Sequence, residues 1–172
     1  WVETLADFEH AIAGQAGGLV WSALYYITPR ADIIGLNADG NLWVADLLDA
    51  RGIPYIGPNA QTMKNLIDKA ATHRILQAHG VRVPANWLAL PAADLPEVAY
   101  PAFVKPCAES RSVGISDESV VHSPEELARR VKYIHDTFQQ AALIEEYLPG
   151  REYTVLMLGN GADQDFLPGL VT

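Results

Sequence analysis

Hydrophobic and polar residues are distributed along the chain in a pattern that predicts short strands alternating with helices. Residues 31–36 are a short apolar run bounded by turn residues, which is typical of a buried strand in a mostly parallel sheet. Residues 41–51 carry apolar side chains at helical spacing, with Asp39 or Asn41 as the candidate N-cap. Residues 53–58 form a second short apolar run, so this part of the chain predicts a strand–helix–strand unit.

The pattern beyond residue 58 predicts a small sheet with helices beside it. Residues 59–80 carry apolar side chains at helical spacing and predict one long helix. Three short strands are expected at 101–106, 114–121 and 142–148. A proline-rich connector precedes the first strand, a polar loop separates the first two, and a helix separates the last two.

The helix after residue 122 has a clear start signal. Ser123 is the expected N-cap, Pro124 occupies the first turn, and Glu126 is placed to close a capping box. A buried stripe should follow at Leu127, Val131, Ile134 and Phe138. Residues 152–171 predict a hairpin whose type I′ turn is Asn160-Gly161.

Composition excludes several classes of function. The 172 residues are 49% hydrophobic and 19% charged, which is typical of a globular protein with a core. A formal charge of −9 argues against nucleic acid and against an anionic membrane surface as partners. The apolar run at 18–27 is about half the length needed to cross a bilayer and is predicted to be buried core, and no signal peptide is indicated. The lone Cys107 favours a reducing compartment, so we expect a cytoplasmic protein.

The residues that could bind a ligand or take part in catalysis occur as four features in a fixed order. They are Asp68-Lys69 at a helix start, Lys105-Pro106 at a strand end, the loop 109–114, and the strand end with its following turn at 145–152. A nucleoside triphosphate needs positive charge for its phosphates, a loop whose N–H groups approach them, and a strand edge with a carboxylate for the base and ribose. The four features together supply these requirements.

Each residue also has a simpler explanation when it is taken alone. Lys69 could be a solvated helix lysine, and Lys105 either projects into a cleft or caps a strand at the surface. Arg111 could bind a phosphate or carboxylate, or lie exposed in its loop. The adjacent Glu145 and Glu146 should point to opposite faces of a strand, so they do not form an acid pair and could simply protect a strand edge.

Read together, these segments resemble the ATP-grasp superfamily, in its D-alanine–D-alanine ligase-like branch, over residues 31–158. The resemblance implies a fold of mixed α/β and α+β class: a partial parallel-sheet pre-ATP-grasp domain followed by the central ATP-grasp subdomain, a small sheet with helices. It places the domains at 1–65, 66–150 and 151–172, the last being the opening hairpin of a C-terminal ATP-grasp domain.

The resemblance also implies the site. Lys69 and Lys105 would contact the ATP phosphates, the stretch 145–148 would hold adenine, and Glu152 would bind ribose. The full set of expected ATP contacts is Lys69, Lys105, Ser110, Ser112, Val113, Gly114, Glu145, Glu146, Leu148 and Glu152, with Arg111 as a candidate catalytic residue. The reaction implied is ligation of a small carboxylate or amino acid to an amine through an acyl-phosphate, with Mg²⁺ bridging the phosphates and its ligands lying outside this chain.

Two departures from the family pattern bear on the substrate. Residues 37–41 stand where the ligases carry a His-Gly and a Glu-Asp-Gly, and Arg111 stands where they place a serine. Because the family's metal ligands lie beyond residue 172, we expect a fragment that binds ATP without catalysing ligation alone, with exposed apolar surface in its hairpin that favours a homodimer. The alternatives are a non-catalytic nucleotide-binding or regulatory module, and a plain α/β domain that binds no nucleotide.

Overall fold

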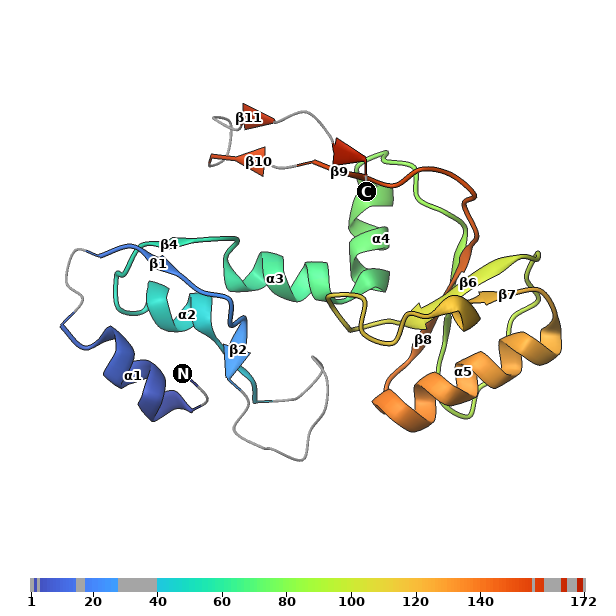
Figure 1. Cartoon of the computed structure of the whole chain (residues 1–172), viewed down its shortest axis with the longest axis horizontal. Coiled ribbons are helices and arrows are strands. Elements are labelled where there is room, and N and C mark those ends of the chain that lie inside the picture. Colours follow the sequence, from blue (N-terminus) through green and yellow to red (C-terminus); the bar gives the residue numbers. More distant parts are fainter. Residues whose placement is uncertain are drawn as a thin grey trace.

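The computed structural model describes residues 2, 4–14, 18–27, 40–155, 157–159, 165–166 and 170–171. Two lobes are joined by consecutive helices, α3 (Ala60–Ile67) and α4 (Lys69–Ala78) (Figure 1). The N-terminal lobe contains α1 (Leu5–Ile12), β1 (Val20–Trp21), β2 (Tyr26–Ile27), β3 (Leu42–Trp43), α2 (Val44–Asp49) and β4 (Tyr55–Ile56). The sheet lobe contains β5 (Asn86–Ala89), β6 (Ala102–Pro106), the 3₁₀ turn η1 (Asp117–Ser119), β7 (Val120–Val121), α5 (Pro124–Phe138) and β8 (Ala142–Glu146).

The N-terminal lobe contains two pairs of short strands. β1 runs parallel to β4, with α2 between them in the sequence, and β2 is antiparallel to β3. Its core is formed by Phe8, Ile27, Val44 and Leu48. A parallel strand–helix–strand unit is therefore present, as predicted, but its described first strand is β1. The predicted strand at 31–36 lies outside the described residues, as does the candidate N-cap Asp39.

Two predictions for this lobe need correction. The run at 18–27 is only partly buried: Ile27 is 3% exposed, whereas Trp21 is 83% exposed. The predicted helix at 41–51 begins only at Val44, because Leu42 and Trp43 pair with β2 as a strand. Asn41 is therefore not the N-cap, and the residue in that position, Trp43, makes no side-chain capping bond.

The single helix predicted over 59–80 is divided at Asp68. This residue has φ −77° and ψ 99°, ending α3 and beginning α4, and its carboxylate accepts the N–H of Ala71 at 2.9 Å. An aspartate N-cap satisfies an otherwise unpaired N–H of the new helix, so the break is stabilised locally. Gly80 follows the end of α4 with φ 73°, as its predicted role as a stop signal requires. The break places Lys69 at the first position of α4.

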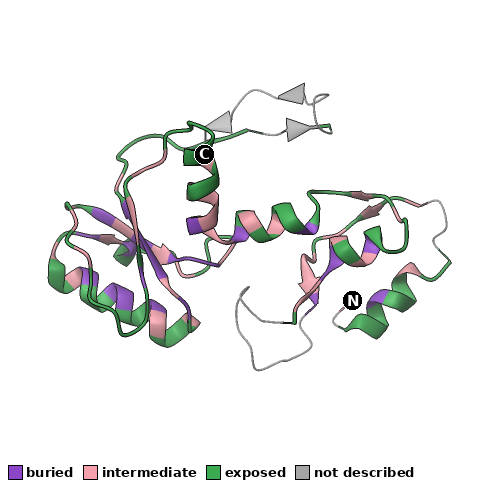
Figure 2. Cartoon of the chain, turned by 180° about the vertical axis from the view of Figure 1, so that it is seen from behind, coloured by how far each residue is buried: buried purple, intermediate pink, exposed green. Residues whose placement is uncertain are grey.

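The sheet lobe is built on one four-stranded sheet. Its strand order is β5-β8-β6-β7, and all its neighbouring strands are antiparallel. Helix α5 packs on one face through Leu127, Val131 and Ile134, which are at most 3% exposed. Each buried aliphatic side chain of this kind contributes about 1.5–3 kcal/mol. Figure 2 shows the buried residues concentrated in β6, β8 and the inner face of α5.

Two details of the sheet lobe differ from the prediction. The strand expected at 114–121 is limited to β7, because η1 and a turn that begins at Ser112 occupy the residues before it. Ser123 caps α5 as predicted, its hydroxyl accepting the N–H of Glu126 at 3.3 Å. The capping box is not closed, however, since the Glu126 carboxylate accepts the N–H of His122 at 2.7 Å.

The segment after the sheet lobe confirms the predicted hairpin in outline. β9 (Tyr153–Thr154) pairs antiparallel with β12 (Leu170–Val171), and β10 (Met157–Leu158) pairs antiparallel with β11 (Asp165–Phe166). The predicted turn at 160–161 lies outside the described residues. Within the described ranges, no helix has both the length and the apolar character needed to span a bilayer. The domain limits at 65 and 150 stay a prediction.

Candidate functional site

The clearest cluster of charged side chains lies where α4 covers one face of the sheet. On β6, Ala102, Val104 and Pro106 are buried on the face toward α5, so Lys105 projects from the opposite face. On β8 that same face carries Leu143 and Glu145. The two segments come together because Ala70 of α4, Leu143 and Cys107 form a small buried apolar cluster.

Within this cluster, Glu145 binds two basic side chains. Its Oε2 lies 2.5 Å from Nζ of Lys105, and its Oε1 lies 3.1 Å from Nε2 of His73. The side chains of Glu145, His73 and Lys105 are 8%, 13% and 19% exposed. The Lys105 ammonium also lies 5.6 Å from the centroid of the Phe103 ring, as expected for alternate residues on one face of a strand. This arrangement is a largely desolvated ionic centre.

Lys69 joins the same centre from the start of α4. Its backbone N–H donates to the carbonyl of Cys107 at 3.0 Å, and its ammonium donates to the carbonyl of Glu109. Burial, followed by repulsion from Lys105, lowers the pKa of Lys69. The two predicted phosphate lysines are therefore close enough to repel each other, which is the arrangement that a polyanion would stabilise.

The loop 109–114 is attached next to these lysines and folds into successive turns. Arg111, Ser112 and Gly114 have φ values of 54°, 59° and 74°. The N–H of Val113 donates to the carbonyl of Ser110 at 3.1 Å. Among the residues that the structure describes, the N–H groups of Arg111, Ser112 and Gly114 donate to no backbone carbonyl. Such a loop has donors available for an anion.

Both ends of the loop are fixed by side chains that the sequence analysis did not select. At its start, Gln140 accepts the N–H of Ala108 at 2.6 Å and donates to the Glu109 carboxylate at 2.8 Å. At its end, Arg130 donates to the carbonyl of Gly114. A Cβ on Gly114 would lie 2.6 Å from Pro106 and 2.9 Å from Phe138, so the chain is held closely at this point.

The middle of the loop reaches the N-terminal lobe. The guanidinium of Arg111 lies 5.7 Å from the ring centroid of Tyr25, a cation–π contact. Tyr26 follows Tyr25 in the sequence, and burial is the main cause that raises the pKa of its phenol. The charge of Glu109 raises this pKa further, whereas the charge of Arg111 lowers it. Arg111 is exposed and otherwise available to an anionic ligand.

The strand end at 145–152 is only partly drawn into this centre. Glu145 and Glu146 point to opposite faces, as predicted: Glu146 is exposed and lies beside Ala85, whose N–H it accepts at 3.4 Å. Leu148 is 62% exposed and Glu152 is also exposed. The structure thus brings Lys69, Lys105 and Glu145 together and leaves Glu146, Leu148 and Glu152 exposed at the end of β8 and in the segment after it.

His73 is the member of the cluster that the sequence analysis missed. It follows Lys69 by four residues, and residues at this spacing share one face of a helix. The spacing was therefore present in the sequence, but only the fold shows that this face of α4 meets Glu145. Cys107 is buried as expected, and burial raises the pKa of its thiol, as for an inert structural cysteine.

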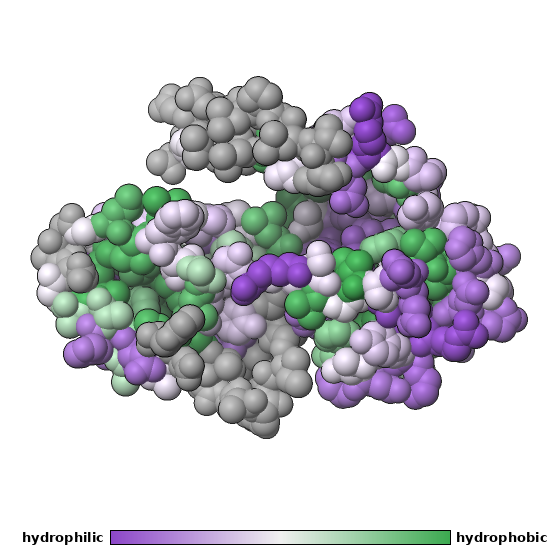
Figure 3. Space-filling view, viewed as in Figure 1, coloured by the Kyte–Doolittle hydropathy of each residue, from purple (hydrophilic) through white to green (hydrophobic). Residues whose placement is uncertain are grey.

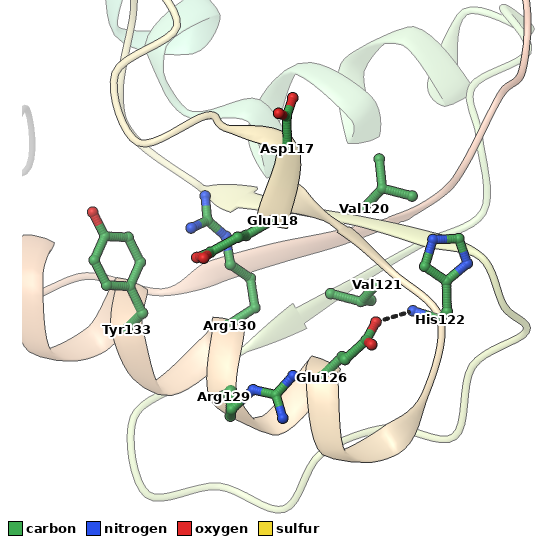
Figure 4. A pocket seen from close by; sticks show the side chains of 9 residues that line it. All are labelled: Asp117, Glu118, Val120, Val121, His122, Glu126, Arg129, Arg130 and Tyr133. Carbon is green, nitrogen blue, oxygen red and sulfur yellow. Dashed lines mark hydrogen bonds between the residues drawn. The ribbon is translucent and has the colours of Figure 1, made fainter.

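A pocket of about 560 Å³ lies elsewhere, between α5, β7 and η1 (Figure 4). Its wall is formed by Asp117, Glu118, Val120, Val121, His122, Glu126, Arg129, Arg130 and Tyr133. None of the predicted site residues is among them. Arg130 points from α5 toward η1, where it donates to the hydroxyl of Ser119 at 2.8 Å (Figure 4). Its link to Gly114 connects this pocket wall to the end of the loop.

The surface of the two lobes differs in character. On the face shown in Figure 3, hydrophilic residues gather over α5 and hydrophobic residues over the N-terminal lobe. Within the described ranges, no group of three or more His, Cys, Asp or Glu side chains is arranged to hold a metal ion.

The fold and site define an ATP-grasp protein, and comparison with known proteins agrees. Residues 79–171 match the family model described as D-ala D-ala ligase C-terminus. A curated D-alanine–D-alanine ligase from Halorhodospira halophila is 37% identical over 123 residues, which cover 69% of this chain and 38% of that protein. The chain therefore belongs to the D-Ala–D-Ala ligase C-terminus family.

Two solved structures show the same fold. D-alanine–D-alanine ligase from Bacillus anthracis complexed with ATP matches with a TM-score of 0.66 and 21% identity, covering 95% of this chain and 50% of that one. L-amino acid ligase from Bacillus licheniformis matches with a TM-score of 0.59 and 25% identity, covering 74% and 28%. The chain spans less than half the length of the curated relatives it matches.

Proposed function

We propose that the centre formed by Lys69, Lys105 and Glu145 binds ATP, and that the chain supplies the nucleotide-binding part of an ATP-dependent carboxylate–amine ligase. The observation that carries the proposal is the pair of mutually repelling, partly buried lysines next to a loop in which three N–H groups donate to no backbone carbonyl of the described residues. The family membership and the ATP complex of the Bacillus anthracis relative support it.

The donor set suits a triphosphate. The ammonium groups of Lys69 and Lys105 are held by a carbonyl and by a carboxylate, both of which phosphate oxygens can replace or share. Ser110, Ser112, Val113 and Gly114 belong to the loop that would cover the phosphates. The segment that follows β8, residues 147–152, would offer peptide groups for adenine and the Glu152 carboxylate for ribose. For Mg²⁺ the described residues provide no ligand cluster, so its ligands are not assigned to them.

The proposed reaction is carboxylate activation followed by amide formation. A substrate carboxylate oxygen attacks the γ-phosphorus and ADP leaves; an amine then attacks the acyl carbon, loses a proton and releases inorganic phosphate. Lys69 and Lys105 would neutralise the phosphates, and Arg111 would contact a phosphate or the substrate carboxylate. The named relatives act on D-alanine and on L-amino acids, so we place the substrate among small amino acids.

Calorimetric titration with ATP tests the proposal, comparing the wild type with Lys105→Met and with Lys132→Met as the matched control. Lys132 is 76% exposed and pairs only with Asp136, four residues along α5, so its loss leaves the site intact. The expected result is binding by the wild type and the Lys132 variant, and at least about tenfold weaker binding by the Lys105 variant. Equal affinities for all three proteins would contradict the proposal.

The ligation step is tested separately by phosphate release from ATP in the presence of D-alanine or another amino acid. Release that depends on the amino acid supports the ligase assignment. ATP binding without such release favours a non-catalytic nucleotide-binding module.

A further inference from the structure

His73 is placed to act on the nucleotide centre without contacting a nucleotide itself. It lies one helical turn after Lys69 on α4, and its Nε2 is 3.1 Å from Oε1 of Glu145. The second carboxylate oxygen of Glu145 is the one that pairs with Lys105. Glu145 thus connects an imidazole on the helix to an ammonium on the sheet, with all three side chains largely removed from water.

The contacts of the ring assign its proton. Nε2 faces a carboxylate, which accepts hydrogen bonds, so Nε2 carries the hydrogen in the neutral ring. Nδ1 is buried and has no hydrogen-bond partner among the residues that the structure describes. Neutral His73 therefore makes one directed hydrogen bond, and that bond fixes the orientation of the Glu145 carboxylate.

We propose that His73 is a positioning residue of the nucleotide site, which holds Glu145 so that Lys105 is presented to the phosphates. This inference rests on the proposed ATP-binding function. Neither the motif order nor the resemblance noted in the sequence assigns His73 a role, and the observation that carries the inference is the shared carboxylate.

Two substitutions separate positioning from simple packing. His73→Leu keeps an apolar body of similar size and removes the donor, whereas His73→Gln keeps an N–H donor. ATP affinity is measured by calorimetry for both variants and the wild type under the same conditions. Urea unfolding of each variant establishes that it is folded.

The expected results are specific. At about pH 8, His73→Leu should bind ATP about tenfold more weakly and His73→Gln within about twofold of the wild type. Wild-type affinity in His73→Leu, or a His73→Gln variant as weak as His73→Leu, would overturn the inference. A wild type that does not bind ATP would instead overturn the proposed function.

Discussion

Lys105 and Glu145 form an ion pair of 2.5 Å diagonally across β6 and β8. Their direct cross-strand partners are different residues, since Lys105 lies opposite Leu143 and Phe103 lies opposite Glu145. The pair lies on the sheet face beneath α4 and is mostly buried, where the desolvation of two charges offsets much of their attraction. The pair also lies beside two further basic side chains, His73 and Lys69. A buried ion pair in such surroundings is better explained by a ligand site than by stability alone.

Removing one partner of this pair should destabilise the protein strongly. We expect Lys105→Met to lower the free energy of unfolding by about 3 kcal/mol, because it leaves the Glu145 carboxylate buried with only His73 beside it. Adding Glu145→Leu should recover most of the loss. Urea unfolding of the two single variants and the double variant measures the coupling; additive losses would show that the two side chains do not interact.

Gly114 should be far less tolerant of a side chain than Gly80. Both residues have nearly the same backbone conformation, with φ 74° and 73°, but a Cβ at Gly80 meets nothing within 4 Å. Gly80→Ala should therefore cost only the backbone strain of about 1 kcal/mol, and Gly114→Ala about 1–3 kcal/mol more, since Pro106 and Phe138 must move. Chemical denaturation of the two variants decides this, and equal losses would count against the close fit at Gly114.

Arg130 should control how readily the loop 109–114 opens. It donates to the Gly114 carbonyl from a buried position, whereas its neighbour Arg129 is exposed and serves as the matched control. Trypsin can cut after Arg111 only when the loop opens. We expect Arg130→Ala to increase the rate of that cut about tenfold, because losing this bond is worth about 1.5 kcal/mol, and Arg129→Ala to leave it unchanged. Equal rates in both variants would show that Arg130 does not anchor the loop.

Lys69 should take up a proton when ATP binds at alkaline pH. Burial and the charge of Lys105 lower its pKa in the free protein, so Lys69 loses its proton at lower pH than an ordinary lysine does. Phosphate oxygens favour the ammonium form and raise the pKa again, which requires proton uptake. Calorimetry in two buffers of different ionisation enthalpy measures that uptake. It should disappear in Lys69→Met, and an uptake unchanged in this variant would assign the proton to another group.

The order of chemical features along the chain predicted more of the site than any single element did. Lys69, Lys105 and Glu145 were each ambiguous alone, yet their order predicted one common site, and the fold brings the three side chains together in the centre that we propose binds ATP. The face of Lys105 followed from strand alternation beside Phe103, and the opposite directions of Glu145 and Glu146 followed from the same period of two. Local periodicity is reliable here because β6 and β8 lie in the middle of the sheet.

The contacts that sequence could not supply come from tertiary packing. Apolar spacing continues through Asp68 and by itself predicts one helix, whereas the motif Asp68-Lys69 predicted a helix start, which the cap on Ala71 confirms. Arg130 and Gln140 fix the loop from distant positions, which no local pattern encodes. The exposure of Trp21 was also missed, because an apolar run predicts burial without saying which of its residues face the core.

The most direct measurement of the central claim is labelling with a lysine-reactive acyl-phosphate derivative of ATP, followed by peptide mass spectrometry. If Lys69 and Lys105 hold the phosphates, these two lysines are acylated first and excess ATP protects them. Lys64 and Lys132, which lie on exposed faces of α3 and α5, should react slowly and without protection. Equal labelling of all these lysines, with no protection of Lys69 or Lys105 by ATP, would contradict the assignment of this centre as the nucleotide site.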